Sequence, residues 1–200
     1  MSYDNYKQAR DTAWQFLIDC QIASLPVDMA KVCSSKEYVL RSYQSGKKAI
    51  AALGLSGQQN VSDGFTFLHS EKYYIFYNDR RSPGRQRFTI THELGHIVLG
   101  HLLEGQYTVV NREPAPGDDP AETQANQFAA RILAPACVLH ALNVNTADEL
   151  SLLCGISQQA AEFRLARLRV LNQRGKYFTS PLERRVYEQF RPFLEAHYHQ

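Results

Sequence analysis

The spacing of apolar residues along the chain predicts mostly helices, with a group of short strands in the first half. Apolar side chains recurring every three or four residues indicate helices that bury one face. Such helices are expected over residues 4–20, 26–33, 85–100, 120–133, 147–154, 158–171 and 181–198, with a turn or two over 47–53. Runs rich in aromatic and apolar residues predict strands over 37–43, 65–69, 72–78 and 107–111. Ser70-Glu71 is expected to join two of these strands as a hairpin.

The helix over 85–100 carries an H-E-x-x-H motif. His92 and His96 are four residues apart, about 40° around a helix, so both can offer a ring nitrogen to one metal ion. Glu93 is rotated by about 100°, too far to join them easily but able to reach a water on the metal. The opposite side is apolar, which indicates a buried helix with a chemical face. The structural alternative is a core helix whose histidines hydrogen-bond to their neighbours.

The helix that begins at Pro120 supplies a candidate third ligand, Glu122. Two histidines and a glutamate leave a fourth position for water, which is typical of catalytic zinc sites. The same carboxylate could instead complete a capping box, because Asp119 is placed as N-cap and Glu122 falls at N3. The spacing leaves both roles open, and Asp118 and Asp119 are weaker ligand candidates.

The longer metzincin motif does not fit this chain. Its glycine and third histidine would fall seven and ten residues after the first histidine, where the chain has Leu99 and Leu102. There is also no methionine after Met29 to form a Met-turn. If the helix continues, His101 points about 180° away from His92, which predicts a core or surface histidine.

Length and composition limit the number of domains and the cellular compartment that we expect. The 200 residues suit one domain or a domain with a small appendage, and 44% apolar residues suffice for a packed core. Charged residues in the first twenty positions predict that this stretch is not the apolar h-region of a signal peptide, and no apolar run approaches the ~20 residues of a spanning helix. Four distant cysteines indicate free thiols in a reducing compartment. We therefore expect a cytoplasmic protein without a membrane partner.

Three units are expected: residues 1–135, a helix-turn-helix-like segment over 136–175, and a C-terminal amphipathic helix or tail over 176–200. The middle unit is rich in basic residues, which would suit a DNA-facing surface. A solvated face of a packing helix is favoured, since an apolar stripe runs along the same helix, so direct nucleic-acid binding is not expected. The basic residues are Arg164, Arg167, Arg169, Arg174 and Lys176, and the stripe is Phe163, Leu165, Leu168 and Leu171.

Two paired motifs carry a resemblance to a known family. They read Arg87-Phe-Thr-Ile-Thr-His-Glu-Leu-Gly-His and Glu122-x-x-Ala125-Asn126-x-Phe128-Ala129-Ala130. Both resemble the ImmA/IrrE family of metallopeptidases, as do Leu25-Pro26-Val27-Asp28, Gly155-Ile-Ser and Arg164-Leu165, so the resemblance covers most of residues 1–170. It implies that zinc is bound by His92, His96 and Glu122 and that Glu93 is catalytic. Thr91 stands where the family usually has alanine, and this small residue should leave metal binding intact.

The resemblance also implies a fold and a function. We expect an α+β protein with a compact zincin-like (gluzincin-type) core, a small antiparallel sheet, the H-E-x-x-H helix and a helix-turn-helix-like appendage. The expected activity is that of a zinc-dependent endopeptidase, with manganese as the alternative metal. Family members cut helix-turn-helix repressors and so derepress prophages, mobile elements or stress genes. The alternative is a non-catalytic anti-repressor or DNA-binding regulator with a structural metal.

Two features of the substrate site remain hypotheses from the sequence. The donor that stabilises the oxyanion is expected among Tyr107, Tyr77 and Arg131, without a choice between them. The strand over 72–78 is hypothesised to present an edge onto which an extended substrate adds by backbone pairing.

Overall fold

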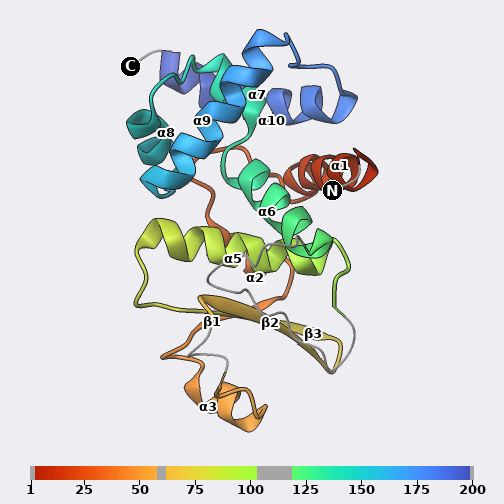
Figure 1. The fold of residues 1–200 in the computed structure, drawn as a ribbon, viewed down its shortest axis with the longest axis vertical. Coiled ribbons are helices and arrows are strands. Elements are labelled where there is room, and N and C mark those ends of the chain that lie inside the picture. The colour runs from red at the N-terminus through yellow and green to blue at the C-terminus, as the bar shows by residue number, and fades with distance from the viewer. Residues whose placement is uncertain (1–2, 58–61, 103–118, 199–200) are drawn as a thin grey trace.

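In the part of the chain that the structure describes, helices make up most of the fold, and three short strands form one sheet against the motif helix (Figure 1). The computed structural model describes residues 3–57, 62–102 and 119–198. The mixed α+β architecture agrees with the sequence prediction. The described elements are α1 (Tyr3–Asp19), α2 (Met29–Ser35), β1 (Val39–Ser42), α3 (Lys47–Ala52), β2 (Gly64–His69), β3 (Lys72–Tyr77), α5 (Pro83–Val98), α6 (Pro120–Leu133), α7 (Ala136–Ala141), α8 (Ala147–Cys154), α9 (Gln158–Gln173) and α10 (Pro181–Tyr198).

The sheet has the strand order β1-β3-β2. Strands β2 and β3 pair antiparallel across Ser70 and Glu71, whose φ angles of 49° and 62° suit a tight hairpin turn, so the predicted hairpin is confirmed. Strand β1 pairs parallel with β3, so the expectation of a purely antiparallel sheet is wrong. Because β3 is the central strand, Ile75 faces a partner on each side. The hypothesis that β3 offers an edge to substrate is therefore wrong as well.

Helix α5 lies between the sheet and helix α6 (Figure 1). Two glycines allow this close packing. A Cβ added to Gly64 of β2 would lie 2.3 Å from Thr89 Cγ2 and 2.9 Å from the carbonyl oxygen of Phe76. A Cβ on Gly95 of α5 would lie 3.1 Å from Ala125 Cα of α6. The motif helix is thus buried on two sides, and its residues 89–97 are all buried.

A continuous apolar core joins the helices after residue 135 to α1, α5 and α6. Phe128, Leu17 and Phe190 are fully buried in it and come from α6, α1 and α10. The Gln189 side chain of α10 also donates to the backbone oxygens of Leu17 and Ile22, at 2.8 and 2.7 Å. The core crosses the positions where the sequence suggested unit boundaries, near residues 135 and 175.

Within the described ranges, no helix combines the length and hydrophobicity needed to span a bilayer.

Several local expectations need correction. Helix α2 begins at Met29 after the N-cap Asp28, so Pro26 precedes the helix instead of lying in its first turn. The apolar stripe of α9 is only partly internal: Leu165 and Leu168 are buried, but Phe163 is 72% exposed. The basic face is divided too, because Arg164 is buried and donates twice to the Ala134 carbonyl oxygen. The proposed strand over 107–111 lies outside the described residues.

Candidate metal centre

Helices α5 and α6 bring three metal-ligating side chains together. The Nε2 atoms of His92 and His96 lie 3.0 Å apart, and each lies 3.2 Å from one oxygen of the Glu122 carboxylate. Both histidines are buried, while the Glu122 side chain is 32% exposed. The trio from the sequence prediction is thus assembled around one point, open on the Glu122 side.

The geometry of this trio fits a metal ion. Tetrahedral zinc with ligand bonds of about 2.0–2.1 Å places its ligand atoms roughly 3.3 Å from one another. The three separations of 3.0, 3.2 and 3.2 Å are close to that spacing. Two nitrogens and one carboxylate also leave a coordination position for water or substrate. His92, His96 and Glu122 could therefore hold one ion in the arrangement of a catalytic site.

Glu122 is directed to the histidines and not to the helix cap. Asp119 caps α6, since its Oδ1 accepts from the Ala121 amide at 2.9 Å. Burial opposes ionisation of Glu122, but hydrogen bonds and charge interactions with His92 and His96 more than offset it and lower its pKa to about 2. The carboxylate is therefore ionised at neutral pH, as a metal ligand requires.

A neighbouring amide fixes the ring orientation of His92. Its Nδ1 lies 2.9 Å from Oδ1 of Asn126, one turn after Glu122 on α6. With Nδ1–H donating to this oxygen, the lone pair of Nε2 points toward the other two ligands. Asn126 belongs to the motif recognised in the sequence, but no role was predicted for it.

His101 fixes the ring orientation of His96 in the same way, contrary to the sequence expectation. Helix α5 ends at Val98, Gly100 has a φ of 74°, and the His101 amide returns to the His96 carbonyl oxygen at 2.9 Å. This reversal brings the Nδ1 atoms of the two histidines to 3.1 Å. The helix does not continue to His101, because the left-handed Gly100 ends it first, so the condition under which His101 would point away from the site is not met.

A directional chain of hydrogen bonds leads from His101 back to α1. His101 Nε2 lies 3.2 Å from Gln124 Oε1, and Gln124 Nε2 donates to Gln8 Oε1 at 3.2 Å. Burial and the neighbouring His96 lower the pKa of His101, outweighing the opposing effect of Gln124. A neutral His101 can donate from Nε2 and accept at Nδ1, which lets His96 donate from Nδ1 and direct Nε2 toward His92 and Glu122.

A hydrogen bond from the sheet positions the Glu93 side chain. The hydroxyl of Thr66 on β2 donates to Glu93 Oε2 at 2.8 Å, and both side chains are fully buried. Glu93 follows His92 directly on the same helix and is not one of the three grouped side chains. Thr66 was missed by sequence reasoning, because only the packing of β2 against α5 brings it to the motif.

The remaining sequence candidates are not joined to the trio. Tyr107 and Asp118 lie outside the described residues. Tyr77 ends β3, where its carbonyl oxygen accepts from the Tyr43 amide. The buried guanidinium of Arg131 donates to the backbone and side-chain oxygens of Gln127, at 2.7 and 2.6 Å. Among the described residues, no hydrogen bond or ion pair links Tyr77 or Arg131 to His92, His96 or Glu122.

The Arg87 side chain connects three of the sequence motifs that lie far apart in the chain. Its guanidinium donates to the carbonyl oxygens of Gly155, at 3.1 Å, and of Val27. A Cβ on Gly155 would lie 3.1 Å from Arg87 Nε and 3.2 Å from Pro26 Cβ. The motif helix, the loop before α2 and the turn between α8 and α9 thus meet at one side chain.

The comparison with known families agrees with this geometry. The model of the Peptidase M78 family, described as the IrrE N-terminal-like domain, matches residues 47–166. The match spans more than half of the chain and includes His92, Glu93, His96 and Glu122. A search of curated proteins gave no match.

Proposed function

Because the chain belongs to the Peptidase M78 family of metallopeptidases, we propose that it is a zinc-dependent endopeptidase that cleaves a helix-turn-helix transcriptional repressor. The observation that carries the proposal is the trio His92, His96 and Glu122 with Glu93 next to it on the same helix. Loss of the repressor would derepress a prophage, a mobile element or stress genes.

The donor set supports zinc as the metal. Imidazole and carboxylate ligands suit zinc, whereas manganese is better served by a larger set of oxygen ligands. When bound, zinc would supply Lewis-acid polarisation of the scissile carbonyl and make the attacking water more acidic. The chain's own contribution is to hold the two histidine ligands in place, His92 through Asn126 and His96 through His101.

Glu93 is the proposed general base. It accepts the proton of the attacking water and later passes it to the leaving amine. The hydrogen bond from Thr66 keeps this carboxylate in one orientation against the sheet. Since Glu93 is not a ligand, replacing it should separate catalysis from metal binding.

The repressor as substrate and the finer architecture follow from the family resemblance. ImmA/IrrE peptidases cut helix-turn-helix repressors, and we extend this to the present chain. We also propose that the core is zincin-like and that α8 and α9 form a helix-turn-helix-like appendage. Direct DNA binding has less support, because Arg164 and Arg167 of α9 donate to internal groups, the Ala134 carbonyl oxygen and the Tyr6 hydroxyl.

Co-expression with helix-turn-helix repressors of the same genome tests the proposal. Gel analysis should show a shortened repressor with the wild type but not with Glu93→Gln, while both proteins carry the same amount of zinc. Purified zinc-loaded protein should also cut a proteome-derived peptide mixture, with products identified by mass spectrometry. If peptides are cut and every repressor stays intact, the substrate assignment is wrong. Equal cleavage by Glu93→Gln would refute the role of Glu93.

A further inference from the structure

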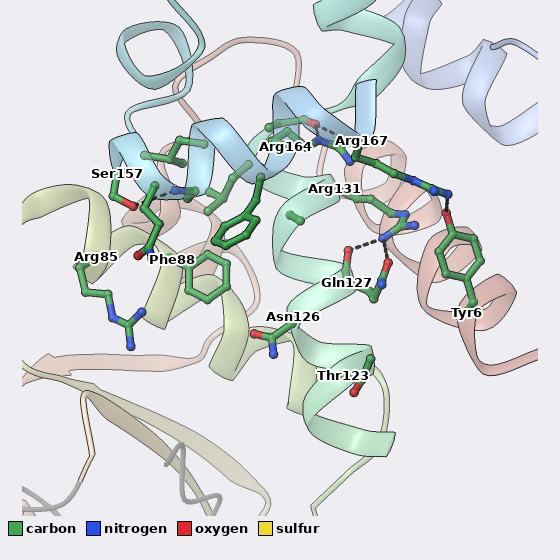
Figure 2. Close-up of a pocket in the computed structure, with 17 residues that line it drawn as sticks. Tyr6, Arg85, Phe88, Thr123, Asn126, Gln127, Arg131, Ser157, Arg164 and Arg167 are labelled. Carbon is green, nitrogen blue, oxygen red and sulfur yellow. Dashed lines mark hydrogen bonds between the residues drawn. The ribbon is translucent and has the colours of Figure 1, made fainter. Parts of the chain in front are cut away.

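A cavity of about 530 Å³ lies beside the metal centre, between α5, α6 and α9 (Figure 2). Its volume is within the range of pockets that hold drug-sized ligands or a large side chain with its flanking backbone. Two of the lining residues, Phe88 and Asn126, are also neighbours of His92. The Phe88 ring centroid lies 6.2 Å from that of His92, and Asn126 Oδ1 lies 2.9 Å from His92 Nδ1. A peptide bound across the centre would therefore have its adjacent residues next to this cavity.

Much of the cavity wall is apolar. Small side chains at Ala130 of α6 and Ala160 of α9 leave room, and Ile156 and Leu133 provide apolar surface. Phe163 also lines the cavity, and this large aromatic side chain is 72% exposed. Phe163 therefore adds an accessible aromatic face to the apolar wall formed by Ile156 and Leu133.

The charge of the wall is positive. Four arginines line the cavity, and no aspartate or glutamate of the described residues does. Arg85 pairs with Asp63 at 2.8 Å, but the other three donate to uncharged oxygens. Arg131 bonds to Gln127, Arg164 to the Ala134 carbonyl oxygen, and Arg167 to the Tyr6 hydroxyl, as Figure 2 shows. Since cationic side chains whose hydrogen bonds go to uncharged oxygens favour a nearby negative charge, the cavity suits an acidic ligand better than a basic one.

We propose that this cavity selects the substrate. It takes a large apolar side chain close to the scissile bond and favours acidic over basic residues beside that side chain. This inference rests on the proposed peptidase function and adds the chemical class of sequence that is cut. It assigns Phe163, Ala160 and Ala130 to the recognition of the apolar side chain.

A matched pair of variants on one helix tests the proposal. Ala160→Leu fills the cavity, whereas Ala166→Leu adds the same atoms at an exposed position of α9 outside the cavity. The zinc-loaded wild type should cut a proteome-derived peptide mixture mainly at sites with a large apolar residue at one fixed position. For synthetic peptides carrying Phe there, Ala160→Leu should lower kcat/KM at least tenfold. With Ala at that position, Ala160→Leu should lower kcat/KM by a much smaller factor, and Ala166→Leu should match the wild type on both peptides.

Two further variants guard against a misleading result. Ala130→Leu fills the same cavity from α6, so its cleavage profile should change in the same direction as that of Ala160→Leu. Arg167→Gln should reduce the preference for Glu over Lys next to the apolar residue. Thermal unfolding establishes that each variant is folded. The inference is overturned if the wild type shows no preference for large apolar residues, or if Ala160→Leu and Ala166→Leu have the same profile.

A binding measurement separates the cavity from the chemistry. Ligand-observed NMR should detect N-acetyl-phenylalaninamide but not N-acetyl-alaninamide on zinc-loaded Glu93→Gln, and the signal should disappear when Ala160→Leu is added. Binding without any peptide cleavage by the wild type would refute the peptidase and leave the cavity assignment standing. Peptide cleavage without a preference for aromatic residues and without aromatic binding would refute the cavity assignment and leave the peptidase standing. If neither cleavage nor aromatic binding is found, both the peptidase function and the cavity assignment are refuted.

Discussion

Thr66 Oγ1 and Glu93 Oε2 lie 2.8 Å apart, in a hydrogen bond that joins the sheet to the motif helix. This contact gives the proposed base a fixed orientation without using a metal ligand. Thr66→Val keeps the shape of the side chain but removes the donor. A hydrogen bond to a charged group contributes about 1.5–3 kcal/mol, so kcat should fall roughly ten- to a hundredfold.

The control for Thr66 is Thr66→Ser, which keeps the hydroxyl and should retain most of the activity. Zinc content, measured by mass spectrometry, should be equal in wild type, Thr66→Val and Thr66→Ser. An unchanged kcat in Thr66→Val would contradict the orienting role. A loss of zinc would mean that the effect comes from the ligand set instead.

His101 should act as a positioning residue for His96. His101→Phe removes the acceptor at 3.1 Å from His96 Nδ1 and should weaken zinc affinity about 10–100-fold, the usual effect of losing a partner that orients a metal ligand. Competition with a chromophoric chelator measures the dissociation constant. His101→Gln, which offers an amide oxygen, should recover part of the affinity.

A matched control for His101 is His140→Phe. His140 stacks on Tyr177, with ring centroids 3.9 Å apart, and takes no part in the metal centre. Its zinc affinity should equal that of the wild type. Equal zinc affinity in His101→Phe and the wild type would refute the positioning role.

Gly64 should be intolerant of even one methyl group. Its added Cβ would lie 2.3 Å from Thr89 Cγ2 and 2.9 Å from a backbone oxygen, so β2 and α5 must separate. Gly64→Ala should therefore lower the free energy of unfolding by about 1–3 kcal/mol, the usual cost of overpacking. Gly57→Ala, where an added Cβ meets nothing within 4 Å, should change it by less than about 0.5 kcal/mol. Urea unfolding compares the two, and equal effects would contradict the close approach.

Asp63 should make stability depend on pH. Its buried carboxylate accepts from Arg81 Nε at 2.7 Å and Arg85 Nε at 2.8 Å. Burial opposes ionisation, but the two guanidinium groups prevail and lower the pKa of Asp63 below its usual 3.8. A lowered folded-state pKa stabilises the protein above the unfolded-state pKa, and this stabilisation is lost as pH falls through the folded-state value.

The test of Asp63 is urea unfolding of metal-free wild type and Asp63→Asn at several pH values. Asp63→Asn should be less stable at pH 7, and the difference should narrow as pH falls below about 4. Added salt should reduce the difference at pH 7, because both arginine side chains are about 40% exposed. A difference that is the same at pH 7 and pH 3 would contradict the ion-pair interpretation.

The sequence predicted the parts of the site that depend on helical spacing. His92, Glu93 and His96 follow from one helix, and Glu122 follows from the start of the next. The competition between capping and ligation at Glu122 could not be decided from spacing, because both roles need the same position. The structure places Asp119 on the cap and the Glu122 carboxylate on the histidines.

The side chains that orient the site residues could not be predicted from the spacing of apolar residues. Thr66 comes from another strand, and its contact with Glu93 depends on how the sheet packs against α5. His101 reaches His96 only because Gly100 adopts a positive φ and reverses the chain. The parallel pairing of β1 with β3 was missed for a similar reason, since alternation within a strand does not reveal its neighbours or their direction.

Metal content of the purified protein tests the central claim most directly. Mass spectrometry should find about one zinc per chain in the wild type, as three ligands around one point require. Glu122→Ala should lose this zinc, because it removes the carboxylate 3.2 Å from both histidine nitrogens. Glu93→Gln should retain it. Full zinc content in Glu122→Ala, or a wild type that binds no metal after reconstitution with zinc or manganese, would contradict the three-ligand centre.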